Sequence, residues 1–303
     1  MTAGPLVMGV DLGGTKVRAA LGDASGALLA IDEAPTADAG AGLDRQLAAL
    51  LGRLAAAAGV DPAAVRATAV GGAGVASADG FTLAPNLAHL DGTDVRGALE
   101  EALGHAVVLE NDVNVAALGE LHAGDAGDDF AFVSLGTGIG MGLVLGGRLI
   151  RGARGAAGEI GYLPLGADPL DPDNHRRGAL EEMVAGETIA QRYEDLTGTA
   201  ASTRQVFSRA ARGDDCAAAV VDGYARWVAA ALGAVIAVVD PGRIVLGGGI
   251  GLRPELLPRV QTWLARIGHS QVPVVTSALG DRAPLAGAVH LALEATHPQG
   301  VPA

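Results

Sequence analysis

A glycine-rich turn near the start of the chain combines groups that bind phosphate. It follows the apolar run Leu6–Val10 and reads Asp11-Leu12-Gly13-Gly14-Thr15-Lys16. Glycines in a tight hairpin can present backbone N–H groups to phosphate oxygens, while the Thr15 hydroxyl and the Lys16 ammonium add donors and charge. The Asp11 carboxylate can hold Mg²⁺, directly or through water. The alternative is an ordinary hairpin turn in which Asp serves turn geometry.

A second glycine-rich turn repeats the plan of the first about 120 residues further on. The string Leu135-Gly136-Thr137-Gly138-Ile139-Gly140 also lies between two apolar runs. A repeat at this scale predicts two similar lobes, each bringing one hairpin to the cleft between them. The repetition favours phosphate binding over an ordinary turn. The sequence contains no P-loop string. No dinucleotide-binding spacing fits the glycines at 136 or 247, which argues against a dinucleotide-binding fold.

The string Glu110-Asn111-Asp112-Val113-Asn114 lies where a predicted strand meets a predicted helix. Polar side chains at the carboxyl end of a strand are typical of a ligand cleft. A carboxylate there can take the proton of an attacking hydroxyl, and neighbouring amides can hold the substrate. The alternative is a helix N-cap, which explains one of these residues but not all of them.

Four further segments carry weaker signals. Gly247-Gly248-Gly249 follows a buried strand, where bare backbone would accept an adenine or a ribose, although a plain strand-to-helix turn explains it equally well. The others are a loop that contains Glu159 and Tyr162, the string Pro85-Asn86-Leu87, and the string from Gly178 to Glu181.

The remaining pattern is that of a mixed α/β protein, in which helices and strands alternate after each hairpin. Turn residues and apolar periodicity predict three-stranded meanders at the two glycine turns. We expect helices at 44–58, 94–103, 111–121, 214–239, 254–267 and 285–295, strands at 66–72, 107–109, 244–246 and 272–276, and a loop over 166–174.

Composition excludes several classes of protein. Of the 303 residues, 50% are hydrophobic and 18% are charged, so the chain can bury a large core. The net charge of −13 argues against binding to nucleic acid or to an anionic membrane. We find no apolar run of the length of a membrane span, about 18 residues. Cys216 is the sole cysteine, which excludes a disulfide framework within the chain and any multi-thiolate metal site. These features indicate a soluble, cytoplasmic protein.

Taken in order, six strings resemble the ROK family of repressors, open reading frames and kinases, and within it the bacterial glucokinases. The resemblance implies an α/β, actin-like (ribonuclease H-like) duplicated two-lobe sugar kinase fold with an inter-lobe cleft. It places residues 1–112 plus about 284–303 in a small lobe and 113–283 in a large lobe. The strings are residues 11–16, 85–87, 110–114, 135–140, 158–161 and 246–249.

The resemblance also implies an ATP-dependent sugar kinase, with glucose converted to glucose 6-phosphate as the first expectation. Asp112 would be the general base, and Asp11 would lie near Mg²⁺. The two hairpins, with Gly13, Gly14, Thr15, Lys16, Gly136, Thr137 and Gly138, would hold the phosphates of ATP, and Gly247, Gly248 and Gly249 the adenosine. The sugar would be held by Asn86, Asn111, Asp112, Glu159, Tyr162 and Glu181. A homodimer is expected from the family.

The chain departs from the family where relatives bind a structural zinc through one His and three Cys. The His position is Tyr162, and the three Cys positions are Pro172, Asn174 and Ala179. A Cys₃His site cannot form with one thiol, so we predict no zinc. Because the lost His also contacts the sugar in relatives, the bulkier Tyr162 can favour a different hexose.

Other functions stay open. A family repressor would need an N-terminal DNA-binding domain, for which the residues before Asp11 leave no room, and the charge of −13 opposes DNA binding. A non-catalytic sugar-binding protein is a further alternative, against which Asp112 and the intact 11–16 turn argue. Among kinases, the acceptor could be mannose, fructose, an N-acetylhexosamine or a natural-product sugar, and the donor could be polyphosphate.

Overall fold

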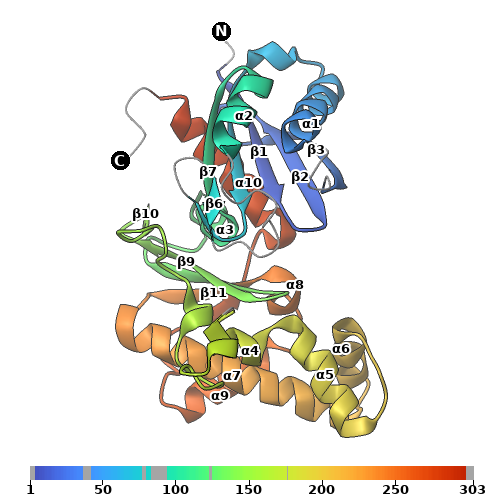
Figure 1. The fold of residues 1–303 in the computed structure, drawn as a ribbon. Coiled ribbons are helices and arrows are strands. Elements are labelled where there is room, and N and C mark those ends of the chain that lie inside the picture. The colour runs from blue at the N-terminus through green and yellow to red at the C-terminus, as the bar shows by residue number, and fades with distance from the viewer. Residues whose placement is uncertain are drawn as a thin grey trace. The chain divides into compact units, whose positions relative to one another are not determined.

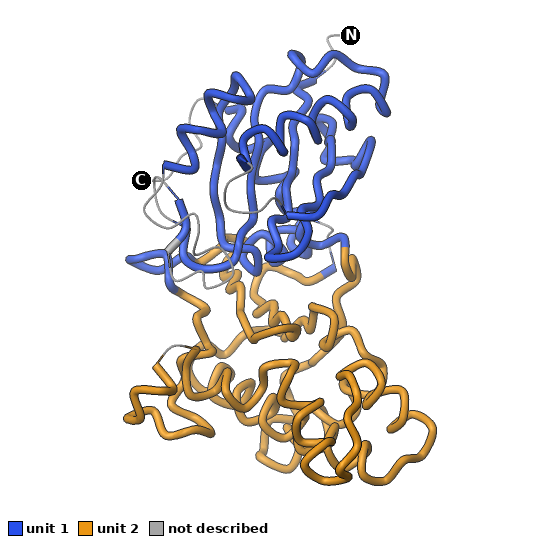
Figure 2. Tube along the Cα trace, turned by 45° about the vertical axis from the view of Figure 1, so that its right-hand side comes forward, with its two compact units in different colours: residues 1–125, 151–156, 282–303 blue, residues 126–150, 157–281 orange. Residues whose placement is uncertain are grey.

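The computed structural model divides the chain into two compact units (Figure 2). Unit 1 consists of residues 1–125, 151–156 and 282–303, and unit 2 of residues 126–150 and 157–281. Within them the structure describes residues 4–36, 42–76, 80–82, 94–122, 125–175 and 177–297. The lobe boundaries expected at residue 112 and near residue 284 stay a prediction.

The centre of unit 1 is a five-stranded sheet with the order β3-β2-β1-β4-β7 (Figure 1). The first three strands form the predicted antiparallel meander, and β4 and β7 continue the sheet parallel to β1. The carboxyl ends of β1, β4 and β7 therefore meet at one edge of the sheet. The strands are β1 (Leu6–Leu12), β2 (Lys16–Gly22), β3 (Leu28–Pro35), β4 (Val65–Gly72) and β7 (Ala106–Asn111).

Helices cover both faces of this sheet, because successive side chains of β1 point to opposite faces. Met8, Val10 and Leu12 share one apolar cluster with leucines of α1 (Leu43–Ala58) and α2 (Val95–Leu103). On the other face Gly9 meets the backbone of α10 (Ala283–Ala295), which packs against α3 (Asp112–His122). A short hairpin of β5 (Val75–Ala76) and β6 (Phe81–Thr82) follows β4.

Glycines let α10 approach α3 and the sheet closely. A Cβ added to Gly287 on α10 would lie 1.7 Å from the carbonyl oxygen of Val115 on α3. One added to Gly119 on α3 would lie 2.2 Å from the carbonyl oxygen of Ala283. Backbone therefore packs on backbone at this crossing, and α10 fixes where α3 lies on the sheet.

Unit 2 repeats the sheet of unit 1. Its strand order, β10-β9-β8-β11-β12, again has an antiparallel meander followed by two parallel strands. The predicted duplication is thus confirmed, with the turn at 136–138 in the place of the turn at 13–15. The strands are β8 (Phe130–Leu135), β9 (Ile139–Leu145), β10 (Arg148–Leu149), β11 (Arg243–Gly247) and β12 (Val274–Thr276).

The helices of unit 2 surround one long apolar helix, α7. Three shorter helices, none of which the sequence pattern predicted, precede it: α4 (Glu181–Val184), α5 (Gly186–Thr197) and α6 (Thr203–Ala211). The expected loop over 166–174 overlaps with a 3₁₀ turn at Pro172–His175. The remaining helices are α7 (Asp215–Val239), α8 (Gly248–Gly251) and α9 (Leu257–Arg266).

Helix α7 corrects the expectation that no run of the sequence reaches the length of a membrane span. Among the described residues it is the one helix whose length and composition would allow it to cross a bilayer. Core helices of globular proteins meet the same criterion. In unit 2, Tyr224, Val228 and Leu232 of this helix are fully buried and pack in the main apolar cluster. These contacts are those of a core helix.

Candidate active site

The first glycine turn is a tight hairpin between β1 and β2. The Gly13 amide donates to the Lys16 carbonyl at 3.0 Å, and the Thr36 hydroxyl donates to the Gly13 carbonyl at 2.6 Å. Gly14, Thr15 and Lys16 are exposed at its tip. The Lys16 ammonium lies 3.3 Å from a carboxylate oxygen of Glu33, an exposed pair that contributes little to stability. The turn thus presents a cation and a hydroxyl at the surface of unit 1.

Asp112 is the first residue of α3, directly after β7. One of its carboxylate oxygens accepts a hydrogen bond from the Val113 amide at 2.9 Å. Asn111 caps the helix, since its side-chain oxygen accepts from the amides of Val113 (2.9 Å) and Asn114 (3.0 Å). Its side-chain nitrogen donates to the Gly74 carbonyl at 2.9 Å. The N-cap alternative therefore holds for Asn111 and leaves Asp112 to be explained.

Asp11 and Asp112 are close enough to interact electrostatically. Burial, and then the negative charge of Asp112, raise the pKa of Asp11 to about 6, although Arg18 and Lys16 oppose this shift. Arg18 is directly opposite Asp11 in the antiparallel pairing of β1 and β2. A carboxyl with a perturbed pKa that lies near a second carboxylate at a strand end, as Asp11 does, is typical of a functional site.

The raised pKa of Asp11 predicts a stability gain when its charge is removed. A carboxyl whose folded-state pKa lies above its unfolded value stabilises the fold at low pH, and this stability is lost as pH rises towards 6. The difference between the folded-state pKa of about 6 and the ordinary value of 3.8 corresponds to about 3 kcal/mol. We expect a smaller effect on stability because Asp11 is partly exposed. We expect the free energy of unfolding of Asp11→Asn to exceed that of the wild type by about 1–2 kcal/mol at pH 8 in the absence of nucleotide.

Chemical denaturation at pH 8 and pH 4 measures this effect. The gain shrinks at pH 4, where the wild-type carboxyl is largely protonated in the fold. Asp61→Asn, at the exposed N-cap of a short 3₁₀ turn, is the matched control for the substitution itself. An Asp11→Asn variant that is less stable than the wild type at pH 8 would contradict the electrostatic argument.

The buried carboxylate of Glu110 binds the residues on both sides of Asp112, a role that the sequence did not predict. Glu110 is 5% exposed, and one of its oxygens accepts from the Asn111 amide and from the Asn114 side chain, both at 2.9 Å. Its other oxygen lies 2.5 Å from Nε of Arg151. Glu110 and Asn114 stand in the same string as Asp112, but nothing in the sequence pointed to Arg151, 41 residues away.

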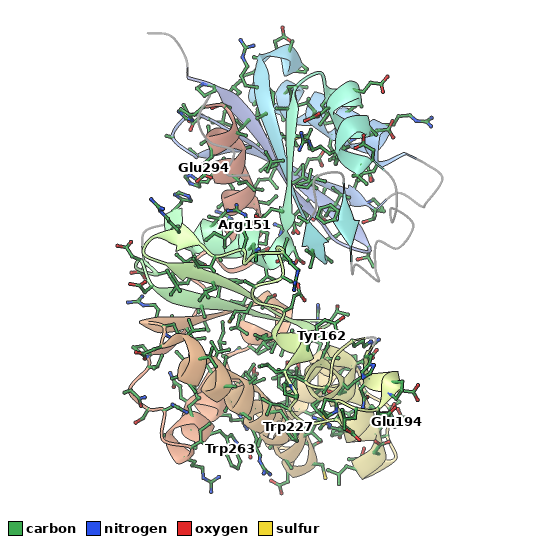
Figure 3. The ribbon with its side chains drawn as sticks, turned by 60° about the vertical axis from the view of Figure 1, so that its left-hand side comes forward. Arg151, Tyr162, Glu194, Trp227, Trp263 and Glu294 are labelled. Carbon is green, nitrogen blue, oxygen red and sulfur yellow. The ribbon has the colours of Figure 1, made fainter. Side chains whose placement is uncertain are left out.

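In unit 2 the structure brings Glu159, Tyr162 and Glu181 together. Burial, and then the charge of Glu181, raise the pKa of Glu159. Burial also raises the pKa of Glu181, against a hydrogen bond from the Ile139 amide at 3.2 Å. Tyr162, which Figure 3 labels, is 45% exposed by its solvent-accessible area. Burial, and then the charges of both glutamates, raise its pKa. The three side chains form an acidic, partly exposed cluster with a phenol beside it.

Two glycines fix the backbone of this cluster. Gly158 has φ +95°, and a Cβ there would lie 1.9 Å from the carbonyl oxygen of Met141. Gly178 has φ +101°, and its Cβ would lie 2.3 Å from the carbonyl oxygen of Gly161. Both positions therefore exclude side chains, and they join the Glu159 loop to β9 and to the segment that leads into α4.

The second glycine turn lies against the same cluster. The Gly136 amide donates to the Gly138 carbonyl at 3.0 Å, which repeats the hydrogen bond of the first turn. A Cβ on Gly138 would lie 2.4 Å from a carboxylate oxygen of Glu181. A Cβ on Gly136 would meet no atom within 4 Å. Gly136 thus faces open space, whereas Gly138 makes room for the acid.

Packing explains two of the three glycines at 247–249. A Cβ on Gly247 would lie 2.2 Å from the ring of Phe132, and one on Gly248, which has φ +76°, would lie 2.4 Å from the Leu135 carbonyl oxygen. A Cβ on Gly249 would meet nothing within 4 Å. The strand-to-helix turn alternative therefore accounts for Gly247 and Gly248, and Gly249 alone offers open backbone. Asn86 lies outside the described residues.

The absence of zinc stays a prediction. Of the positions at which relatives bind zinc, Pro172 and Ala179 carry no side chain that could bind a metal ion. No group of three or more His, Cys, Asp or Glu able to hold a metal ion occurs in the described part of the chain. The loop that would carry the metal is closed by its own hydrogen bonds instead. The Asn174 side chain donates to the Asp168 carbonyl at 2.8 Å, and His175 Nε2 lies 2.9 Å from the Pro169 carbonyl oxygen.

The duplicated sheet order identifies the class of protein. Similar solved structures have the actin-like, two-lobe fold of sugar kinases. One is a ROK family glucokinase from Streptomyces griseus in complex with glucose and AMPPNP, with a TM-score of 0.77 and 28% identity, covering 95% of this chain and 99% of that one. The fold expected from the sequence is confirmed.

The chain belongs to the ROK family, whose sequence model matches residues 7–295. A kanosamine kinase from Amycolatopsis mediterranei is 31% identical over 294 residues, which cover 95% of this chain and 96% of that protein. A bifunctional enzyme, NanE/NanK, from Brucella melitensis is 40% identical over 195 residues. That match covers 63% of this chain and only 36% of the bifunctional enzyme, so the chain spans about a third of its length.

Proposed function

We propose that this protein is an ATP-dependent sugar kinase that transfers the γ-phosphoryl group to a hexose hydroxyl, with Asp112 as the general base. The proposal rests first on one observation: Asp112 lies at the start of α3, near enough to Asp11 to help raise its pKa to about 6. Membership of the ROK family supports it. Glucose, with glucose 6-phosphate as product, is the first candidate acceptor.

The residues present fit a nucleotide with its metal ion. The exposed Thr15 and Lys16 would bind phosphate oxygens, and Asp11 would hold Mg²⁺, directly or through water. Gly136, Thr137 and Gly138 would approach the phosphates from the second turn, and Gly249 would leave room for adenosine. ATP supplies the phosphoryl group, and the metal ion offsets the charge that builds up on it.

Side chains of this protein would position the sugar and accept the proton of its hydroxyl. Glu159, Tyr162 and Glu181 would accept hydrogen bonds from sugar hydroxyls or donate to them, and so fix the sugar. Asp112 would take the proton of the attacking hydroxyl. Because its backbone is pinned by the Asn111 cap, this carboxylate needs little reorganisation when the sugar binds.

A second candidate acceptor is an amino sugar. Two observations favour it: a kanosamine kinase aligns with 95% of this chain, and the carboxylates of Glu159 and Glu181 beside Tyr162 could bind an ammonium group. Assaying ADP release with glucose, mannose, fructose, N-acetylhexosamines and free amino sugars decides between the candidates. Each sugar is tested with ATP-Mg²⁺ and with polyphosphate. If no sugar is phosphorylated while the nucleotide still binds, the kinase proposal fails.

We expect Glu181→Gln to raise the KM for the sugar by about 10- to 100-fold, since a hydrogen bond to a charged group contributes about 1.5–3 kcal/mol. The Gln oxygen can still accept from the Ile139 amide, so the fold is preserved. The KM for ATP stays close to the wild-type value. Glu194→Gln, on the exposed face of α5 (Figure 3), is the control. Equal sugar KM values for both variants would remove Glu181 from the sugar site.

The expected cytoplasmic location and homodimer remain parts of this proposal. Sedimentation of the purified protein at several concentrations tests the dimer: a single species with the 30.0 kDa mass of one chain would contradict it.

A further inference from the structure

The segment 151–156 interrupts the division of the chain into units. The residues on both sides of it belong to unit 2, whereas the segment itself belongs to unit 1. It contacts unit 1 at two places. Nε of Arg151 lies 2.5 Å from an oxygen of Glu110, and Gly155, at φ +73°, packs near Val75, whose Cγ1 would lie 3.2 Å from an added Cβ (Figure 3 labels Arg151).

These two contacts converge on the turn that holds Asp112. Glu110 accepts from the Asn111 amide and from the Asn114 side chain, while the Asn111 side chain donates to the carbonyl of Gly74, next to Val75. The residues 110–114, the start of the short hairpin and the segment 151–156 therefore form one connected assembly. Along the chain, the segment continues directly into Glu159 and Tyr162.

The charge of Glu110 makes this assembly depend on Arg151. A carboxylate that is 5% exposed loses most of its hydration and needs a cation or hydrogen-bond donors in compensation. Two of its contacts are neutral hydrogen bonds, and Arg151 supplies the positive charge. Removing a single partner of such a pair leaves an uncompensated buried charge. That charge would lie two residues before Asp112.

We propose that Arg151 is a positioning residue for Asp112, acting through Glu110. It keeps the buried carboxylate compensated, so that Glu110 holds the amide of Asn111 and the side chain of Asn114, and the first turn of α3 keeps its place. This inference rests on the proposed function only in naming Asp112 as the base.

Kinetic constants of matched variants test the inference. We expect Arg151→Met to lower kcat by about 100-fold, the cost typical of a catalytic group displaced by about 1 Å, with the KM for ATP little changed. Arg151→Lys, which keeps the charge but lacks Nε, recovers part of the loss. Arg154→Met is the control: this residue lies on the same segment and is exposed, with no hydrogen bond or ion pair among the described residues.

The double variant Glu110→Gln/Arg151→Met separates positioning from a direct role. A Gln oxygen can still accept from Asn111 and Asn114, and no buried charge is left without a partner. We therefore expect the kcat of the double variant to be at least tenfold higher than that of Arg151→Met, because no buried charge is left uncompensated. If the reductions of kcat caused by Glu110→Gln and by Arg151→Met multiply in the double variant, Arg151 acts directly on a substrate.

Hydrogen exchange tests the inference without relying on turnover. In the free protein, Arg151→Met should speed exchange of the Val113 and Asn114 amides, and Arg154→Met should not. If exchange and kcat both match the wild type, Arg151 has no positioning role. If the wild type phosphorylates no sugar but the exchange difference is present, the proposed function fails while the contact between Arg151 and the turn stands.

Discussion

Replacing Asp112 by Asn should lower kcat by about 10³-fold and leave the KM for the sugar within a few-fold of the wild-type value. A positioned general base contributes about 10²- to 10⁴-fold, and this contribution is realised only as the hydroxyl proton leaves. The amide of Asn keeps the size of the side chain and its contact with the first turn of α3, but it cannot take a proton at neutral pH.

Steady-state kinetics with the best sugar of the panel provide the measurement. Asp215→Asn is the matched control, because Asp215 is also the first residue of a helix, α7, and is exposed. Circular dichroism establishes that both variants fold. A variant at position 112 that retains more than about a tenth of the wild-type kcat would exclude Asp112 as the base, since loss of a general base costs at least about 10²-fold.

The second large effect concerns stability. Adding one methyl group at Gly287 should destabilise unit 1 by about 3 kcal/mol or more, because the new Cβ would lie 1.7 Å from the Val115 carbonyl oxygen and 2.7 Å from the Gly119 amide nitrogen. Backbone atoms in two packed helices cannot turn aside as a side chain can. Helix α10 would have to move away from α3, and α3 begins with Asp112.

Gly52→Ala is the control for Gly287→Ala. Gly52 lies in the interior of α1, in the same unit, and a Cβ there would meet nothing within 4 Å. This substitution should stabilise the protein by about 0.5–1 kcal/mol through helix propensity. Chemical denaturation of both variants compares the effects. If Gly287→Ala unfolds at the wild-type denaturant concentration, the close crossing of α3 and α10 is wrong.

Local patterns predicted those parts of the fold that local forces determine. The glycine turns and apolar runs predicted both meanders, and helical periodicity predicted α1, α7 and α10 within a few residues. The parallel strands of each sheet could be proposed as strands but not ordered, because their neighbours are distant in sequence. The helices α4, α5 and α6 were missed although α5 and α6 carry buried residues at helical spacing: Gly186, Ile189 and Tyr193 in α5, and Val206, Phe207 and Ala210 in α6.

The same distinction applies to the candidate site. Asp11 and Asp112 could be chosen from their strings, because each carries an acid at a predicted strand end. The sequence could not separate the glycines that pack from those that face open space: Phe132 and Leu135 explain Gly247 and Gly248 only once the chain is folded. The ion pair of Glu110 with Arg151 spans 41 residues and follows no local rule, so it could not be predicted.

The position of α10 in the sequence affects the order in which the two units can be completed during translation. Unit 2 ends at residue 281, whereas unit 1 gains its last helix only when residues 283–295 have been synthesised. Domains generally fold as units during translation, in the order in which they emerge. Here the unit that begins first is completed second, so we expect the sheet surface around Gly9 to stay uncovered in the nascent chain until residues 283–295 have emerged.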